Sequence, residues 1–276
     1  MQNFKMPTRK QDSNKGTFGK VLNFCGSENY IGAAYLSTVS SLKVGAGLSA
    51  LSTTQMAINS VSSLLPEAVY LTREEGLEKI NDFTTVLIGC GLGLNKESED
   101  LFNKVLAKIK SETPIVIDAD GLNILANKIT PSALWAPSPS REGIILTPHP
   151  LEASRLLDCS LNEILSDIEG SAKKISQKYK CVTVLKTHHT VICNKDLTIH
   201  RNLYGNSALA KSGTGDVLAG IIAGLLAQKM PAFEAAKLGV YLHSRTGEIL
   251  SETLTEYSVL ASDLPKFLHK AIKEIL

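Results

Sequence analysis

The sequence TVLIGCGLGLNKESEDLFNKVLAKIKSETPIVID, residues 85–118, decides the fold class of this chain. It begins and ends with short apolar runs, Thr85–Cys90 and Pro114–Asp118, in which hydrophobicity is continuous rather than alternating. Continuous hydrophobicity is expected of strands that are covered on both faces. Between these runs, Ser98–Ile109 places its apolar residues on one stripe of an amphipathic helix. A strand, a helix and a second strand in this order predict a βαβ crossover within a parallel sheet.

The same alternation extends to both sides of this segment. Apolar runs bounded by turn residues predict further strands at Gly19–Cys25, Leu48–Ser52, Gly143–Thr147 and Cys181–Lys186. Helices are predicted near residues 31–44 and 54–65, and the first of these is rich in small residues that can pack in the core or against another subunit. We therefore expect an α/β fold with a mainly parallel central sheet and helices on both faces.

Past Lys186 the pattern changes. Two short strand candidates, Val191–Cys193 and Leu197–Ile199, predict a hairpin or an antiparallel sheet edge. The remainder is predicted to be almost entirely helical, at Val217–Gln228, Ala232–Leu250 and Leu264–Ile275. The sequence shows no proline- or serine-rich linker and no internal repeat, so we expect residues 1–276 to form a single domain.

Composition and charge exclude several classes of protein. The 276 residues are 43% hydrophobic with a net charge of +2, so neither nucleic acid nor a membrane is expected as a partner. Five dispersed cysteines without a C-x-x-C pair indicate reduced thiols rather than a disulfide scaffold or structural zinc. The longest apolar run, Val217–Ala227, is shorter than the roughly 20 residues of a membrane helix, and residues 1–20 lack the apolar region of a signal peptide. We expect a cytoplasmic protein.

The segment GNSALAKSGTGD, residues 205–216, runs directly into the predicted apolar helix. Four small, permissive residues precede its aspartate: Ser212, Gly213, Thr214 and Gly215. Backbone N–H groups left unpaired at a helix N-terminus form a pocket for phosphate oxygens or a developing anion. Asp216, ionised by the helix dipole, can accept a proton from a substrate hydroxyl. A plain helix N-cap, with Thr214 or Asp216 capping, explains the same residues equally well.

Two predicted strand ends carry features with open alternatives. Gly89–Gly93, GCGLG, lacks the spacing of a dinucleotide-binding fingerprint, and the sequence contains no P-loop motif. Its glycines suit either close approach to a ligand or a tight turn between a strand and a helix. Asp118 and Asp120 can hold Mg²⁺ through water or cap the following turn.

Two further strand ends present ionisable side chains. His149 and Glu152, in IILTPHPLE, lie at a predicted carboxyl edge, where open α/β sheets bind ligands, although both also suit structural roles. Lys186, at the end of CVTVLK, can reach a phosphate as a point charge. His188 and His189 point in opposite directions on an extended segment and have no third ligand nearby, so we expect no metal there.

Taken in order, six segments resemble those of the ADP- or ATP-dependent NAD(P)H-hydrate dehydratases, which are ribokinase-like proteins. The segments are TFGKVLNFCGSENYIGAA, VLIGCGLGL, PIVIDADGLNIL, ILTPHPLEASRLL, VLKTHHTVI and GNSALAKSGTGDVLAGIIAGLLAQ. The resemblance spans roughly Thr17 to Pro265 and implies a three-layer α/β/α sandwich. The resemblance does not extend to the N-terminal epimerase domain that some family members carry, so we expect a protein similar to the stand-alone dehydratase.

The resemblance implies roles for individual residues. It places four residues against the hydrated nicotinamide nucleotide: Ala33, Gly91, His149 and Asp216. It assigns nucleotide binding to Lys186, Thr187, His188, His189, Thr190 and Gly215. Four departures from the family pattern are Ile31 and Cys90 in place of proline and Thr187 and Ser212 in place of glycine. None removes a charged or proton-handling group, so we interpret them as changes in loop shape that leave the choice between ATP and ADP open.

The chemistry that the resemblance implies is the repair of NADH or NADPH to which water has added. Phosphoryl transfer turns the hydroxyl of the S-epimer into a good leaving group; phosphate is released, with AMP from ADP or ADP from ATP. Asp216 is the implied base, the Ser212–Gly215 amides hold the phosphoryl group, and Mg²⁺ bridges the donor phosphates with Glu152 as a water-mediated partner. A homo-oligomer, a tetramer by family analogy, and a functional link to an NAD(P)H-hydrate epimerase are also implied.

Two other functions fit parts of the sequence. A ribokinase-like kinase of a small alcohol, such as a vitamin precursor or sugar, would share the GTGD helix start and would release a stable phosphorylated product. A nucleotide-sensing protein on the same scaffold would have no need of the aspartate in GTGD. The TPHP and GNSALAKSGTGD segments favour the dehydratase.

Overall fold

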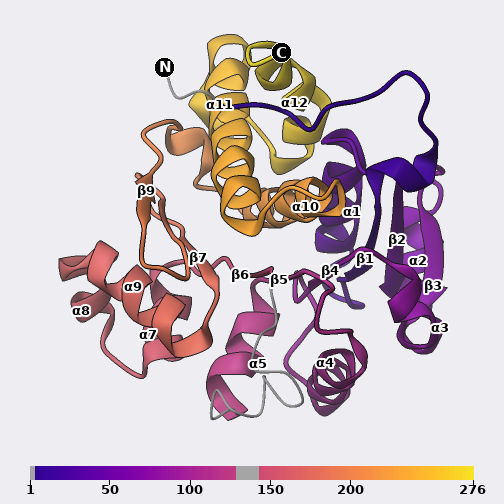
Figure 1. The fold of residues 1–276 in the computed structure, drawn as a ribbon, viewed down its shortest axis with the longest axis horizontal. Helices are drawn as coiled ribbons and strands as arrows, with labels where there is room; N and C mark the ends of the chain where they lie inside the picture. Colours follow the sequence, from indigo (N-terminus) through magenta and orange to yellow (C-terminus); the bar gives the residue numbers. More distant parts are fainter. Residues whose placement is uncertain (1–3, 129–142) are drawn as a thin grey trace.

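The computed structural model describes residues 4–128 and 143–276, in which nine strands form one sheet (Figure 1). The strand order is β3-β2-β1-β4-β5-β6-β7-β8-β9. The strands are β1 (Lys20–Phe24), β2 (Leu48–Thr53), β3 (Val69–Thr72), β4 (Thr85–Ile88), β5 (Ile115–Ile117), β6 (Ile144–Leu146), β7 (Val182–Leu185), β8 (Val191–Cys193) and β9 (Ile199–Arg201). Neighbouring strands from β3 to β7 are parallel. The β7–β8 and β8–β9 pairs are antiparallel, which confirms the predicted antiparallel edge.

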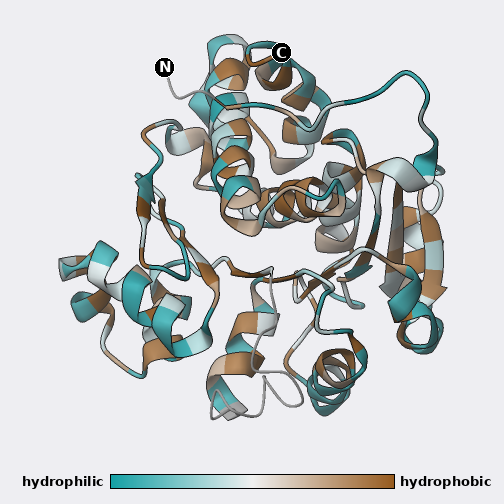
Figure 2. Ribbon diagram, in the orientation of Figure 1, coloured by the Kyte–Doolittle hydropathy of each residue, from teal (hydrophilic) through white to brown (hydrophobic). Residues whose placement is uncertain are grey.

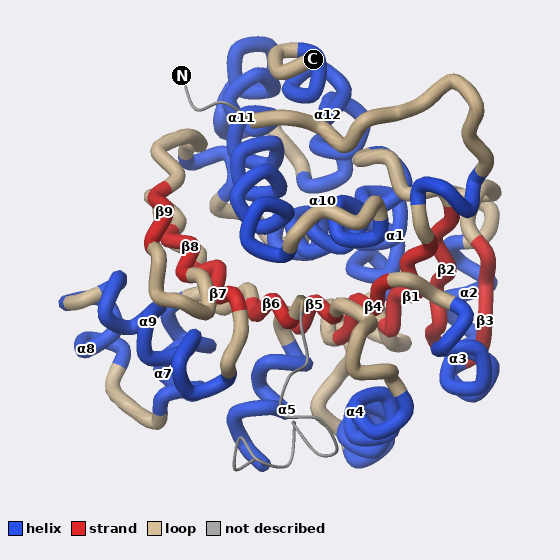
Figure 3. Tube along the Cα trace, in the orientation of Figure 1, coloured by secondary structure: helices blue, strands red, loops and turns tan. Residues whose placement is uncertain are grey.

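Helices cover both faces of the sheet, so the fold has three layers (Figure 3). One layer holds α1 (Ile31–Lys43), α2 (Gln55–Val61), α10 (Thr214–Ala227), α11 (Ala232–Ser258) and α12 (Leu264–Lys273). The other holds α3 (Arg73–Lys79), α4 (Lys96–Lys108), α5 (Asp120–Lys128), α7 (Pro150–Leu157), α8 (Leu161–Ser166) and α9 (Ile168–Tyr179). Short 3-10 helices occur at Lys15–Phe18, Ile80–Asp82, Ser207–Leu209 and Ala261–Asp263. Each layer packs a separate hydrophobic core against the sheet, as expected for strands with two covered faces.

Helix α10 is the central helix of its layer and is apolar around almost its whole circumference (Figure 2). Such a helix must be buried on all sides. Two glycines bring its backbone against α1: a Cβ on Gly220 would lie 2.2 Å from Ser37 O, and one on Gly224 would lie 2.6 Å from Ser41 O. The small residues of α1 therefore pack inside the molecule against α10.

The structure corrects several predicted boundaries. The last strand begins at Ile199 rather than Leu197, because Leu197 has a φ of 68° and its amide donates to Asn194 O in the turn. Strand β3 and helix α3 were not predicted, and α2 ends at Val61, before the expected end at Leu65. Helix α11 extends past Leu250 to Ser258 with a kink at Thr255, where φ is 64°. None of the helices in the described ranges is long and apolar enough to cross a membrane.

The parallel strands bring five loops to one edge of the sheet. The segments that follow β1, β4, β5, β6 and β7 begin at their carboxyl ends, where open α/β sheets bind ligands. Helix α10 packs across β1, β4 and β5, and its N-terminus reaches the same edge. The motifs that the sequence separates by more than a hundred residues are thereby collected around the start of α10.

Candidate active site

The start of α10 has no side-chain cap. Gly213 is the N-cap residue, with φ 89° and ψ −16°, and no side chain caps the helix. The first helical hydrogen bond runs from Val217 N to Gly213 O at 3.2 Å, so the amides of Gly215 and Asp216 precede the helical ladder. The helix was predicted to start at Val217, but it starts at Thr214, so Asp216 lies in its first turn. Neither Thr214 nor Asp216 caps it.

Thr214 instead holds the preceding loop in place. Its hydroxyl donates to Leu209 O at 2.8 Å or to Lys211 O at 2.9 Å, and its amide donates to Lys211 O at 3.4 Å. One of the amides in the predicted anion pocket is therefore already partnered. Ser212 is exposed at the outer side of the turn.

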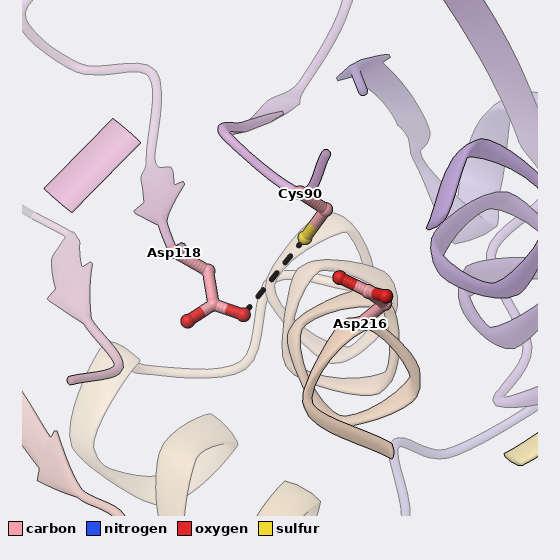
Figure 4. Close-up of side chains that lie close together, drawn as sticks. All are labelled: Cys90, Asp118 and Asp216. Carbon is pink, nitrogen blue, oxygen red and sulfur yellow. Dashed lines mark hydrogen bonds between the residues drawn. The ribbon is translucent and has the colours of Figure 1, made fainter. Parts of the chain in front are cut away.

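Asp216 lies close to two other side chains that offer potential metal-ligand atoms, and the three come from different elements. The Cys90 sulfur and one oxygen each of Asp118 and Asp216 lie within 4.8 Å of one another (Figure 4). Burial and the negative charge of Asp118 raise the pKa of Asp216 to about 6, against a smaller opposing effect of a hydrogen bond from Cys90 and the charge of Lys186. A carboxylate with a pKa near neutral is poised to accept a proton from an alcohol.

Lys186 joins Asp118 of this group to Glu152 of α7. Its Nζ lies 2.7 Å from Asp118 Oδ1 and 3.9 Å from Glu152 Oε2. Burial favours the neutral amine, but Asp118 and Glu152 outweigh it and raise the pKa of Lys186, so the ammonium stays charged. A Cβ placed on Gly215 would lie 3.5 Å from Lys186 Nζ. The ammonium thus lies directly beside the first amides of α10.

His149 and Glu152 form the N-terminal cap of α7. Glu152 N donates to His149 Nδ1 at 3.2 Å, and His149 N donates to Glu152 Oε2 at 2.8 Å. Burial and Lys186 lower the pKa of His149, and burial raises the pKa of Glu152 to about 7. Both residues thus have a structural role, and the half-exposed His149 side chain also lines the cavity beside α10.

The two aspartates of the IDADG segment have separate roles. Asp118 pairs with Lys186, whereas Asp120 Oδ2 accepts a hydrogen bond from Gly93 N at 2.8 Å and so fixes the loop after β4. Burial raises the pKa of Asp120. Asp120 therefore tethers the loop after β4 to the end of β5.

A cavity of about 650 Å³ opens beside the N-terminus of α10. Seven residues that the sequence assigned to the site line it: His149, Lys186, Thr187, His188, Thr190, Thr214 and Gly215. His189 is exposed, and its carbonyl accepts a hydrogen bond from the Thr187 hydroxyl at 2.7 Å. The volume lies within the usual range of about 300–1,000 Å³ for small-molecule sites.

Other residues lining this cavity were not assigned to the site from the sequence. They include Tyr204, Asn206, Leu209, Lys211 and His243. Burial lowers the pKa of His243 to about 4, so its ring is neutral, and its Nε2 has no hydrogen-bond partner among the described residues. Asn206, Leu209 and Lys211 belong to the GNSALAKSGTGD segment, whereas no motif marks Tyr204 or His243. Asp118 and Cys90 lie in motifs that the sequence analysis singled out, but their proximity to Asp216 was not predicted.

Ala33 and Gly91 lie against each other in the structure. Gly91 has a φ of 60°, and a Cβ placed on it would lie 2.8 Å from the Ala33 Cβ and 2.6 Å from the Tyr30 Cβ. Neither Ala33 nor Gly91 lines the 650 Å³ cavity. These two residues of the sequence-predicted site therefore lie outside the cavity beside α10.

The three-layer sheet order and the helix start at its carboxyl edge define a ribokinase-like protein. A ribokinase-like superfamily protein from Enterococcus faecalis V583 superposes with a TM-score of 0.87 at 30% identity, covering 98% of this chain and 92% of that chain. The model of the NAD(P)H-hydrate dehydratase family matches residues 21–270. The chain belongs to this family.

Individual relatives agree with this assignment. The ADP-dependent (S)-NAD(P)H-hydrate dehydratase of Neisseria meningitidis is 35% identical over 89% of this chain and 81% of its own length. The crystal structure of the ADP/ATP-dependent NAD(P)H-hydrate dehydratase from Bacillus subtilis, co-crystallised with ATP/Mg²⁺, has a TM-score of 0.86 at 32% identity, covering 98% of this chain and 95% of that one.

Two further comparisons bear on length and on the kinase alternative. The chain spans 51% of the bifunctional NAD(P)H-hydrate repair enzyme Nnr of Coxiella burnetii, with 37% identity over 94% of this chain. Hydroxyethylthiazole kinase from Pyrococcus horikoshii has a TM-score of 0.63 at only 14% identity, with 93% of this chain covered and 89% of that chain. The likeness to this kinase shows the fold alone.

Proposed function

We propose that this chain dehydrates the S-epimer of NADH or NADPH hydrate back to NAD(P)H, with ADP or ATP as the phosphoryl donor. Family membership sets the reaction class, and one observation carries the assignment to this site. Asp216, a carboxyl group with a raised pKa, lies in the first turn of α10, and the Lys186 ammonium lies beside the same turn. A base and an anion-binding helix start are thus adjacent, as phosphoryl transfer to an alcohol requires.

The proposed reaction has two stages. The ring hydroxyl oxygen attacks the terminal phosphorus of the donor, the bond from that phosphorus to its bridging oxygen breaks, and Asp216 takes the hydroxyl proton. The ring nitrogen lone pair then expels phosphate, and loss of a proton from the adjacent ring carbon restores the dihydropyridine. The Gly215 and Asp216 amides and Lys186 stabilise the negative charge of the migrating phosphoryl group.

The donor nucleotide belongs in the 650 Å³ cavity beside Lys186–Thr190. The hydrated nicotinamide belongs on the opposite side of Asp216, against Ala33 and Gly91, with His149 near the junction. With this arrangement, the donor phosphates and the acceptor hydroxyl meet at the start of α10. Positioning alone accounts for a large part of catalysis in reactions of this kind.

Mg²⁺ is expected at this site together with the donor nucleotide. Both Glu152 oxygens face His149, at 2.8 Å from its amide and 3.4 Å from its ring, and Asp118 Oδ1 is held by Lys186. Mg²⁺ prefers oxygen ligands and retains several waters, so Glu152 is its expected water-mediated neighbour. When bound, the ion would neutralise charge on the donor phosphates.

An absorbance assay tests the proposal. The protein is incubated with hydrated NADH and either ADP or ATP, and recovery of reduced-ring absorbance is followed. Recovered absorbance with release of phosphate supports the dehydratase, and phosphorylation of another alcohol supports the kinase. If neither reaction is observed, the result supports a nucleotide sensor. Light scattering tests the proposed homotetramer, and a coupled assay with an NAD(P)H-hydrate epimerase tests whether the R-epimer is used through that partner.

A further inference from the structure

The loop after β4 holds Cys90 rigidly beside the proposed base. Gly26 N donates to Cys90 O at 2.7 Å, and Leu92 N donates to Gly89 O at 3.1 Å. Together with the Asp120–Gly93 hydrogen bond, these contacts fix the loop at both ends. The Cys90 side chain is fully buried, so its thiol has a defined position rather than a solvated one.

The thiol faces two carboxylates. Its sulfur lies 3.9 Å from Asp118 Oδ2, and Figure 4 shows it between the Asp118 and Asp216 side chains. Lys186 engages the other oxygen of Asp118, Oδ1, and therefore leaves Oδ2 facing Cys90. A neutral S–H group is a weak donor but has no negative charge of its own, so it can lie between two carboxylates without repelling either.

The charged groups around Asp216 determine how readily it ionises, so a donor in this group affects that ionisation. Asp118 and Asp120 disfavour its ionised form, and Lys186 and Cys90 favour it. From α11, the buried His243 contributes no charge because burial keeps its ring neutral. The neighbouring Cys25 and burial raise the pKa of Cys90, which keeps its thiol protonated.

We propose that Cys90 is a positioning residue for Asp216: its thiol lies between the Asp118 and Asp216 carboxylates and donates to Asp118, which offsets the negative charge that disfavours the ionised base. This inference rests on the proposed function.

The pH dependence of kcat/KM tests this role. Cys90→Ala is expected to move the acidic limb of the profile to higher pH by about 0.5–1 unit, the scale expected when a single weak hydrogen bond to a carboxylate is lost. Cys90→Ser, which restores a donor, is expected to return the limb toward that of the natural protein. The phosphates of the nucleotide titrate identically in every sample. Only the differences in the acidic limb between variants are therefore interpreted.

Cys181→Ala is the matched control. Cys181 is also fully buried, but it lies just before the amino end of β7, whereas Lys186 follows the carboxyl end of that strand. Its substitution is expected to leave the acidic limb in place, and ADP binding by calorimetry verifies that each variant is folded. An unshifted limb in Cys90→Ala, or equal shifts in the alanine and serine variants, would overturn the proposal. If the natural protein itself does not restore NADH, the proposed function fails instead.

Discussion

Lys186 Nζ lies 2.7 Å from Asp118 Oδ1, and this ion pair joins the end of β7 to the end of β5 across β6. The Asp118 side chain is 2% exposed and that of Lys186 20%, so both charges are largely removed from water. A buried charge is tolerated when its partner is present and becomes costly when the partner is removed. The pair therefore links the stability of the sheet to the position of the ammonium beside α10.

Lys186→Met is expected to lower both stability and activity. Removing one partner of a buried pair typically costs about 3 kcal/mol of unfolding free energy, because the remaining carboxylate is unpaired. Urea denaturation measures this loss. The double variant Lys186→Met/Asp118→Asn removes the unpaired charge and is expected to recover most of the stability but not the dehydratase rate. A single variant as stable as the natural protein would contradict this interpretation.

Asp216→Asn is expected to reduce kcat by roughly 10²–10⁴-fold, the usual contribution of a general base. Asparagine has nearly the same shape but cannot accept the hydroxyl proton. Nucleotide binding, measured by calorimetry with ADP, should be retained because the cavity beside Lys186 is unchanged. Near-normal turnover would remove Asp216 from its proposed role.

The rate of dehydration should depend on the ionisation of Asp216. Burial and Asp118 raise the pKa of this carboxyl group to about 6, and only its ionised form can accept a proton. kcat/KM is therefore expected to rise with pH through about 6 and to level off above it. The residual rate of Asp216→Asn, measured in the same buffers, should lack this limb. A profile that is flat from about pH 5 to 8 in the natural protein would exclude a base with the raised pKa.

The same raised pKa predicts an effect on stability of opposite sign to that of most carboxylates. The folded state holds a proton on Asp216 more tightly than the unfolded state, whose pKa is 3.8. This stability is fully present below the unfolded pKa and is lost as pH rises through about 6. Asp216→Asn is thus expected to gain about 1–2 kcal/mol at pH 8 and less at pH 4.5. Denaturation at the two pH values checks whether the gain decreases on acidification.

Gly213→Ala is expected to slow catalysis by disturbing the start of α10. Gly213 has a φ of 89°, and a Cβ there would lie 2.7 Å from Leu36 Cδ1. The left-handed conformation costs a non-glycine residue about 1–2 kcal/mol, so the turn is expected to shift and displace the Gly215 and Asp216 amides. The expected result is a lower kcat with a smaller fall in unfolding free energy. Unchanged kcat would show that the amide positions are not critical.

The alternation of strands and helices was readable from the sequence because its physical cause is local. Continuous apolar runs such as TVLI and IVI must be covered on both faces, and the intervening amphipathic stripes supply the cover. The motifs at the strand ends were also visible, and their family resemblance is confirmed by the comparisons. The missed strand β3 has mixed burial and lies at the edge of the sheet, so its pattern is weak.

Contacts between distant segments were decided only by the tertiary structure. The sequence could not show that Lys186 pairs with Asp118, or that the Cys90 thiol lies between two carboxylates, because those contacts depend on strand order. Nor could it choose between an N-cap and an anion pocket in the GTGD segment. The sequence by itself thus determined the layers, the reaction family and the residues at the strand ends, since hydrophobic pattern and motif are local properties. Folding decided which charges meet around Asp216, since electrostatic effects depend on distance and burial in three dimensions.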